Sequence, residues 1–354
     1  MVNRLKGILI CVLSLLLARI ISDSLGFLIF GLSYSPISPI IIAIVIGLVF
    51  GNSINKLTDY TDGFTFCTNY VLKLGIILLG IRLSLGDIAL YGLTGIIIIT
   101  PCIMMAIISI KILRNYFIVS DNLSLLIAVG TSICGATAIM ALAPLINAKK
   151  EEISYAIANI TIFGLLAMFI YPIIGYYILN DHSLAIGLFL GSSIHETAQV
   201  AGSGMIYAQQ YSNPSVLEIS TVIKLVRNTT MVVVIPFLAH LSFKANVHNS
   251  NKIISIGSIF PYFIIGFIIF GLIRTFGDYY EYKIGIELWG SIIQFTKGSA
   301  ENLLIIAMSA VGYNTKINKF KKLGLKPFYL GFIVAIIVGV VSITTIYIAG
   351  VTQL

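Results

Sequence analysis

The stretch NLSLLIAVGTSICGATAIMALAPLIN, residues 122–147, is long and apolar enough to cross a bilayer, yet small polar residues occupy its middle. A spanning helix needs about 20 apolar residues. Gly130 and Gly135 flank this polar centre, and Pro144 follows it. A helix can be interrupted at membrane depth only where its free backbone groups meet a polar environment. We therefore predict a broken transmembrane helix here, with a helix-packing face of small residues as the alternative.

The rest of the chain is also too apolar for a water-soluble protein. It has 354 residues, of which 58% are hydrophobic and 10% are charged, whereas a soluble protein carries roughly 25% charged residues. This excludes a cytosolic enzyme, a secreted domain and a disordered regulator. We predict an all-α polytopic membrane protein with about eleven transmembrane helices. The expected spans are 6–29, 36–54, 69–84, 88–112, 122–147, 152–178, 183–208, 216–241, 254–275, 285–312 and 326–350.

The net charge of +8 is explained by membrane orientation. With the N-terminus inside, the inner loops hold about twice as many Lys and Arg residues as the outer loops, as the positive-inside rule requires. The run KFKKLGLK at 319–326 then lies inside, near lipid phosphates. No basic run accompanies a nucleic-acid-binding pattern. The four cysteines show no metal or disulfide spacing, so buried free thiols are expected at Cys11, Cys67, Cys102 and Cys134.

A weak internal repeat suggests the domain organisation. GLVFGNSI at 47–54 resembles GLFLGSSI at 187–194. We predict an extra N-terminal helix over 1–35, a first five-helix repeat over 36–180 and a second over 183–354. Five is odd, so the second repeat is inverted in the membrane, an arrangement typical of alternating-access transporters. Chance similarity between apolar segments is the alternative.

The repeat also predicts a second broken helix that crosses the first. The corresponding span contains FTKGSAEN at 295–302, whose polar residues interrupt an apolar helix. We assign structural roles at this break to Lys297, Gly298 and Asn302, and a substrate contact to Ser299. A direct substrate contact by Lys297 stays open.

Several charged side chains lie at predicted membrane depth, where they usually face a cavity or a partner. They are Lys73, His195, Glu196, Lys224, Arg227, Lys297 and Glu301. Cations outnumber carboxylates in this set, which favours a site for an anion. For each residue the alternative is an interhelical ion pair or a side chain that extends to the interface.

The segment GSSIHETAQVAGSG at 191–204 is the second polar stretch. On a continuous helix, Ser192, Glu196, Gln199 and Ser203 share one stripe. The HETAQ sequence resembles a zinc-binding HExxH motif, but Gln199 replaces the second histidine, so too few ligands remain for catalytic zinc. His195 is a candidate for carrying a coupling proton, or else a buried histidine of the core.

Two cations share a helical face in the segment STVIKLVRNTT at 220–230. Lys224 and Arg227 are three residues apart, and Asn228 follows. The planar guanidinium of Arg227 suits bidentate recognition of an oxyanion. An ion pair between Arg227 and Glu196 is the alternative.

These segments together resemble the YeiH-like family of bacterial membrane proteins, which is described as a family of sulfate exporters. The matching stretches are LKLGIILLGIRLSL (72–85), GTSICGATAI (130–139), KKEEISYAIANITIFGLLAMFIYP (149–172), SIHETAQVAGSG (193–204) and IKLVRN (223–228). They cover most of the chain in the family's order. This chain has Glu196 where the family pattern has aspartate, and Asn228 is also less typical.

The resemblance implies the superfamily of cation–proton antiporters and bile-acid symporters. That fold has inverted five-helix repeats, a core domain with two crossing broken helices, and a panel domain. The resemblance places Thr131, Ser132 and Cys134 on the first broken helix, and His195, Glu196 and Gln199 on a polar helix. It implies a bacterial inner membrane protein, here with a cytoplasmic N-terminus and an external C-terminus.

These observations lead to one main functional hypothesis and two alternatives. The main one is a secondary transporter, specifically an exporter, of a small anion such as sulfate or an organic sulfonate, with elevator-like alternating access. Substrate contacts are expected from Thr131, Ser132, Cys134, Ser193, Gln199, Lys224, Arg227 and Ser299, and ion coupling from His195, Glu196 and Glu301. No ATP-binding loop GxxxxGK[ST] occurs.

The first alternative is a Na⁺/proton antiporter that uses Glu196 and Glu301 as titrating ligands. The second is a membrane enzyme with His195 and Glu196 as acid and base, although no nucleophile or metal set accompanies them. The expected partners are a small anion, the lipid bilayer, a coupling proton or sodium ion and, in one version, a second copy of the chain. No nucleic acid, resident cofactor or enzymatic activity is expected.

Overall fold

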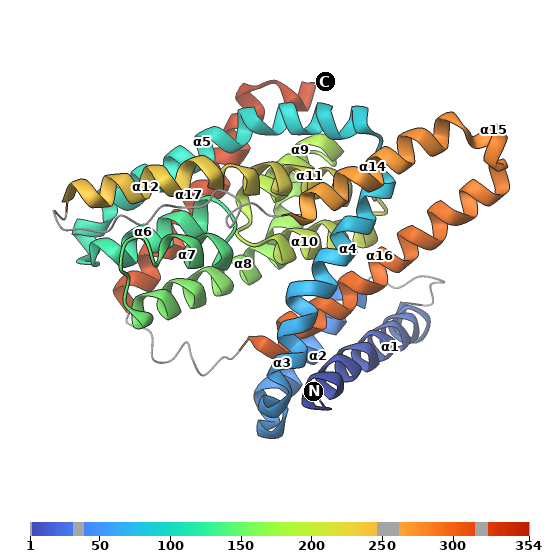
Figure 1. Ribbon diagram of the computed structural model, residues 1–354, viewed down its shortest axis with the longest axis horizontal. Coiled ribbons are helices and arrows are strands. Elements are labelled where there is room, and N and C mark those ends of the chain that lie inside the picture. Colours follow the sequence, from blue (N-terminus) through green and yellow to red (C-terminus); the bar gives the residue numbers. More distant parts are fainter. Residues whose placement is uncertain (1, 31–38, 246–261, 316–324, 354) are drawn as a thin grey trace. The chain divides into compact units, whose positions relative to one another are not determined.

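The computed structural model describes residues 2–30, 39–245, 262–315 and 325–353. All regular elements in these ranges are helices, and no strand occurs among them (Figure 1). The contacts divide the chain into two compact units. Unit 1 comprises Met1–Leu90, Ala201–Glu218 and Tyr262–Asn318, and unit 2 comprises Tyr91–Val200, Ile219–Pro261 and Lys319–Leu354.

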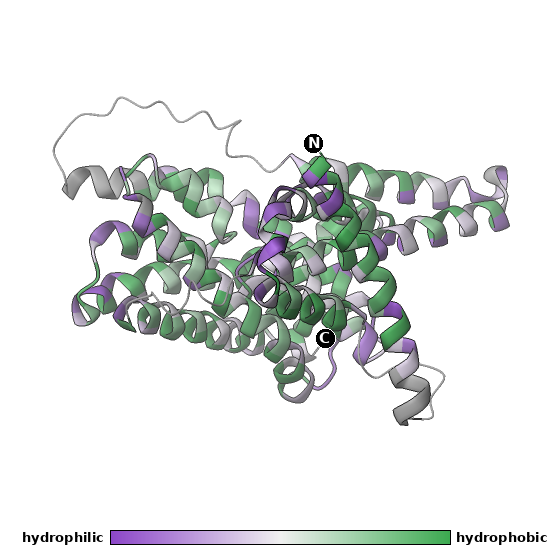
Figure 2. Cartoon of the chain, turned by 90° about the horizontal axis from the view of Figure 1, so that it is seen from below, coloured by the Kyte–Doolittle hydropathy of each residue, from purple (hydrophilic) through white to green (hydrophobic). Residues whose placement is uncertain are grey.

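The helices have the length and composition of a membrane protein. In the described part of the chain, six helices are long and apolar enough to span a bilayer: Val2–Ser24, Asn55–Arg82, Leu85–Phe117, Glu151–Ile178, Ser215–Leu238 and Leu325–Ile348. Two apolar helices are shorter, Pro39–Ser53 and Ser183–Ser193. Hydrophobic residues dominate the long helices (Figure 2), and many large apolar side chains are exposed, which suits a lipid solvent. The predicted all-α membrane class is confirmed, while eleven spans and the inverted repeat stay predictions.

Unit 1 contains the N-terminal helices and a helical hairpin. The N-terminal elements are α1 (Val2–Phe30), α2 (Pro39–Ser53), η1 (Asn55–Tyr60), α3 (Thr61–Phe66), η2 (Cys67–Val71), α4 (Leu72–Leu79) and η3 (Gly80–Arg82). The hairpin consists of α14 (Phe263–Tyr279), α15 (Glu281–Ile284) and α16 (Ile286–Asn314). Trp289 Nε1 donates to Asp278 Oδ1 at 2.8 Å, which joins the two arms of the hairpin near its turn.

The second predicted helix break is wrong. α16 runs without interruption through 295–302, although this segment contains Lys297, Gly298 and Asn302. A single glycine lowers helix stability by only about 1 kcal/mol relative to alanine, so Gly298 alone does not end a helix that is otherwise favourable. Lys297, Gly298 and Asn302 therefore have no structural role at a helix break, because α16 is continuous there.

Glycines allow α2 and α16 to cross at close range in unit 1. A Cβ atom on Gly312 would lie 2.4 Å from the Ile44 oxygen and 2.9 Å from the Gly47 Cα. Nothing lies within 4 Å of the position of a Cβ atom on Gly298, in the same helix. Gly298 and Gly312 of α16 thus differ in how much room surrounds them.

We expect Gly312→Ala to lower the free energy of unfolding by at least about 2 kcal/mol, because the new methyl group overlaps the backbone of α2. Gly298→Ala is the matched control, and we expect it to leave stability unchanged or to raise it by up to about 1 kcal/mol. Thermal unfolding of both variants in detergent measures the difference. Equal melting temperatures would contradict the close crossing.

Unit 2 contains most of α5 (Leu85–Phe117) and the helices on either side of two short breaks, at 133–135 and 194–196. The complete helices are α6 (Asp121–Ser132), α7 (Ala136–Leu142), α8 (Lys150–Ile178), α9 (Ser183–Ser193) and α17 (Leu325–Ile348), with α12 (Met231–Ala245) and η5 (Val351–Gln353). It also contains the start of α10 (Thr197–Gln210) and most of α11 (Ser215–Thr229).

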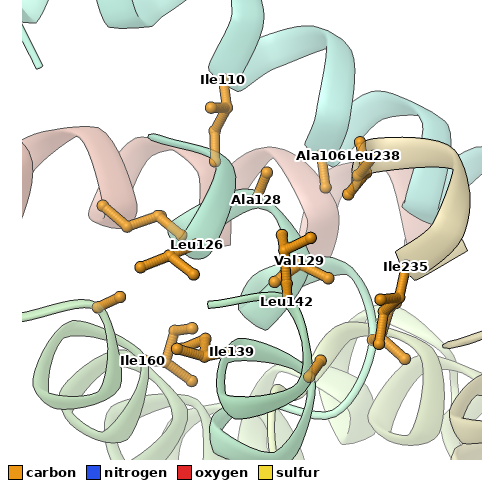
Figure 3. Close-up of a cluster of buried hydrophobic side chains, with 14 of the residues drawn as sticks. Ala106, Ile110, Leu126, Ala128, Val129, Ile139, Leu142, Ile160, Ile235 and Leu238 are labelled. Carbon is orange, nitrogen blue, oxygen red and sulfur yellow. The ribbon is translucent and has the colours of Figure 1, made fainter. Parts of the chain in front are cut away.

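A buried apolar cluster holds the helices of unit 2 together (Figure 3). Val129 of α6 and Ile139 of α7 lie in this cluster with Ile160 of α8 and Ile235 of α12. A Cβ atom on Gly130 would lie 1.8 Å from the end of the Ile160 side chain, so a larger residue there would displace Ile160. The cluster therefore packs directly against the first interruption.

The predicted domains are consecutive sequence repeats. The compact units are a different division of the chain, because each unit combines separate stretches from both predicted repeats. The expected free thiols are confirmed, since Cys11, Cys67, Cys102 and Cys134 are all buried and unpaired by disulfides. The basic run at 319–326 lies mostly outside the described residues, so its expected place at the inner surface stays a prediction.

Candidate functional site

Two breaks between consecutive helices, both within the described residues of unit 2, carry the candidate site. α6 ends at Ser132 and α7 begins at Ala136, with Gly135 between them at a φ of 63°. Glycine adopts this left-handed conformation without steric cost, and the Gly135 N–H donates to the Gly130 oxygen at 3.0 Å. The chain is thus interrupted where the glycines of the 130–138 segment predict it. Cys134 lies buried within this interruption.

The second interruption lies at 194–196, between α9 and α10. The sequence predicts one continuous helix over 191–204, and this prediction is wrong. The predicted stripe from Ser192 to Ser203 is divided between α9 and α10. A signal for this break was present. Gly130-Thr131-Ser132-Ile133 and Gly191-Ser192-Ser193-Ile194 have the same pattern, and in each the helix ends at the last serine.

Lys224 of α11 joins the two interruptions. Its ammonium group is fully buried and donates to the Ile133 oxygen and the Ile194 oxygen, each at 2.8 Å, and to the His195 oxygen at 2.5 Å. Three acceptors use all three N–H groups of a lysine. One side chain therefore holds the chain directly after α6 and directly after α9.

Arg227 lies one helical turn further along α11 and makes contacts of the same kind. Its Nε donates to the Ser132 oxygen at 2.8 Å, and Nη2 donates to the Thr131 oxygen. Nη1 donates to the Ser192 oxygen at 2.7 Å and to the Ile194 oxygen at 3.0 Å. The guanidinium group thus connects the last carbonyls of α6 to those of α9.

These contacts have an electrostatic reason. The last carbonyls of a helix lack intrahelical partners and carry a partial negative charge. Lys224 and Arg227 supply both the missing donors and the opposite charge to α6 and α9. Their N–H groups are therefore mostly occupied by backbone, and the fork of Arg227 is not free for an oxyanion. The alternative ion pair between Arg227 and Glu196 does not occur among the described residues.

Glu196 lies at the N-terminal end of a helix, whereas Lys224 and Arg227 lie at C-terminal ends. Its Oε1 accepts from the Ala136 N–H, the first residue of α7, at 3.4 Å. A Cβ atom on Gly135 would lie 2.4 Å from the Glu196 Cγ, so glycine leaves the space that this carboxylate occupies. A negative charge at a helix N-terminus is favourable. Two cations and one carboxylate therefore surround the two interruptions.

Gln199 and Ser193 fix the connection between α9 and α10. Gln199 Oε1 accepts from the Glu196 N–H at 3.1 Å, and its Nε2 donates to the Thr161 oxygen of α8 at 3.3 Å. The hydroxyl of Ser193 donates to the Phe189 oxygen within α9. Both predicted substrate residues thus have backbone partners, as does Ser132, whose hydroxyl donates to the Val129 oxygen at 3.4 Å.

Three buried polar atoms beside the interruptions have no hydrogen-bond partner in the described part of the chain. They are Thr131 Oγ1, His195 Nδ1 and Asn228 Oδ1. Each side chain is at most 2% exposed. Buried polar groups are nearly always paired, so three exceptions in one region indicate a place for a polar ligand. We call the group of residues around the two interruptions the crossing. It consists of Thr131, His195, Glu196, Lys224, Arg227 and Asn228.

The other predicted site residues belong to unit 1. Lys297, Gly298, Ser299, Glu301 and Asn302 lie on α16. Glu301 forms an ion pair with Arg82, which also contacts Glu218 at 3.4 Å, and Asn302 Oδ1 accepts from Arg19 at 2.5 Å.

Glu301 and Glu196 therefore lie in different units, and Glu301 already has a cationic partner. An antiport site built from both carboxylates stays a prediction. Among the described residues, no cluster of three or more metal-ligating side chains occurs.

Comparisons with known proteins agree on one family. The sequence profile described as conserved hypothetical protein 698 matches residues 6–331. A UPF0324 membrane protein of Fusobacterium nucleatum is 33% identical over 348 residues, which cover 96% of this chain and 97% of that protein. One of Pasteurella multocida is 34% identical and covers 84% of each chain, and one of Streptococcus agalactiae is 31% identical, covering 88% of this chain and 90% of the relative. No solved structure matches the chain.

Proposed function

Because the chain belongs to the UPF0324 family of conserved membrane proteins, we propose that it is a secondary transporter, and specifically an exporter, of a small anion such as sulfate or an organic sulfonate. One observation carries the proposal. Two fully buried cations, Lys224 and Arg227, accompany one carboxylate, Glu196, around two interrupted helices. The crossing therefore has an excess of one positive charge when His195 is neutral and Glu196 is ionised.

The excess charge acts through space and does not require free N–H groups on the cations. At short range in a medium of low dielectric constant, a charge attracts an opposite charge much more strongly than in water. The backbone contacts hold Lys224 and Arg227 in place, so their charge is present before the anion arrives. Polar atoms without partners, such as Thr131 Oγ1, then supply the direct contacts.

Unit 2 contains both interruptions and all residues of the crossing. This supports an elevator-like mechanism in which unit 2 carries the anion as one body. His195 and Glu196 bind or relay the coupling ion, a proton or sodium. Ionisable groups inside membrane proteins commonly serve this purpose.

The experiment is a flux assay with the purified protein in proteoliposomes. We expect saturable, protein-dependent uptake of labelled sulfate or methanesulfonate, and protein-dependent movement of labelled Na⁺ only when the anion is also transported. In Lys224→Met the anion flux falls at least about tenfold, since a tenfold loss corresponds to only about 1.4 kcal/mol of lost attraction. Lys73→Met is the matched control, because Lys73 is exposed on α4 of unit 1.

Two results contradict the proposal. One is Na⁺ flux without anion flux in the wild-type protein. The other is a monodisperse, folded Lys224→Met variant that moves anions at the wild-type rate. Should this variant fail to fold, the comparison of anion and Na⁺ fluxes in the wild-type protein still decides the question.

A further inference from the structure

Asn228 presents a buried acceptor that nothing in the described part of the chain satisfies. Its Nδ2 donates to Thr197 Oγ1 at 3.0 Å, at the start of α10. Its Oδ1 has no partner, although the side chain is only 2% exposed. Of the three unpaired atoms, this one can only accept, in the amide orientation that lets Nδ2 donate to Thr197 Oγ1. A hydroxyl or an imidazole nitrogen can act as donor or acceptor, whereas an amide oxygen can only accept.

The position of Asn228 connects this acceptor to the crossing. Asn228 follows Arg227 on α11, and its partner Thr197 follows Glu196. The hydrogen bond to Thr197 orients the amide, so its oxygen is directed away from that hydroxyl. An acceptor in this place has no attraction for a fully deprotonated oxyanion, which carries only acceptors. It does complement a ligand that brings an N–H or O–H group.

We propose that the transported substrate is a singly charged anion with a hydrogen-bond donor of its own, and that Asn228 Oδ1 accepts from this donor. A hydroxyalkanesulfonate or a protonated oxyanion has this chemistry. The inference rests on the proposed anion transport and narrows its substrate class. With Glu196 ionised, the single excess positive charge of the crossing matches a monoanion better than the sulfate dianion.

Asn228 is then a specificity-determining residue. A site built to pair with a substrate hydroxyl discriminates strongly against the analogue that lacks it, because its own buried polar group is left unpaired. The charge on Lys224 and Arg227 attracts both anions equally. The difference in affinity between the hydroxylated anion and its analogue therefore depends on the Asn228 amide and is independent of Lys224 and Arg227.

The experiment compares two anions of equal charge and similar size, 2-hydroxyethanesulfonate and ethanesulfonate. Half-saturating concentrations are measured for both in counterflow with wild-type protein in proteoliposomes. We expect the hydroxylated anion to half-saturate at a concentration at least about tenfold lower. In Asn228→Leu, which removes the acceptor at similar volume, we expect the ratio of the two values to fall close to one.

The possible results separate this inference from the proposed function. Equal half-saturation of wild-type protein by both anions, or a preference for ethanesulfonate, overturns the inference and leaves anion transport intact. An unchanged tenfold ratio in Asn228→Leu overturns the assignment to Asn228. If neither these anions nor sulfate is moved or raises the melting temperature, the proposed function fails, and this inference fails with it. The wild-type comparison is decisive even if the variant does not fold.

Discussion

Replacing Arg227 by methionine should lower the free energy of unfolding by at least about 4 kcal/mol. The change removes the donors to the Thr131, Ser132 and Ser192 carbonyls at the ends of α6 and α9, while the Ile194 oxygen keeps its donor from Lys224. A buried acceptor that loses its partner costs about 1–3 kcal/mol, and removal of one member of a buried charged network typically costs 3–5 kcal/mol. Methionine keeps most of the apolar volume, so the loss reflects the missing hydrogen bonds and charge.

The matched control for this prediction is Arg274→Met. Arg274 on α14 pairs with Asp278 at 2.6 Å, and both side chains are partly exposed, at 25% and 40%. Exposed ion pairs contribute about 0–1 kcal/mol, so this variant should remain near wild-type stability. Size-exclusion chromatography after heating in detergent measures both variants. Equal stability of the two would show that Arg227 does not hold the interruptions together.

The two interruptions differ in how far the sequence predicts them. The first depends on residues within the segment itself, since Gly135 adopts a left-handed conformation that local composition suggests. The second has no glycine at 194–196. There the chain is held by Lys224, from a helix about 30 residues further on. This break is held by tertiary contacts, and its only local signal is the Gly-x-Ser-Ile pattern that it shares with the first interruption.

The polar segment of α16 led to the opposite error. Lys297, Gly298 and Asn302 interrupt an apolar pattern without interrupting the helix. Polar residues stop a helix only when some other conformation satisfies their backbone groups better. The apolar composition correctly predicted the membrane class, because the overall fractions of hydrophobic and charged residues decide whether a chain suits lipid or water. Sequence reasoning also placed Lys224 and Arg227 on one face, but their acceptors are backbone carbonyls of other helices, which no side-chain pattern reveals.

Glu196 provides the second large effect, on energy coupling. In Glu196→Gln we expect uptake driven by a pH gradient to fall at least about tenfold, while counterflow at equal pH persists. Glutamine has nearly the same shape and keeps an acceptor for the Ala136 N–H, so the fold around α7 is retained. It cannot bind and release a proton, which ionisable residues in transporters do. Loss of the negative charge also leaves the charge of Lys224 and Arg227 uncompensated, which strengthens the attraction for the anion.

The comparison variant is Glu301→Gln, because Glu301 was the other predicted coupling residue. It forms an ion pair with Arg82 in unit 1, so we expect pH-driven uptake to persist in this variant. Both variants are measured in the same vesicles, with the internal pH set and labelled anion added outside. Full pH-driven accumulation by Glu196→Gln would exclude Glu196 as the coupling group. Loss of coupling in Glu301→Gln alone would move the proton site to the Arg82 ion pair, and with it the coupling mechanism from unit 2 to unit 1.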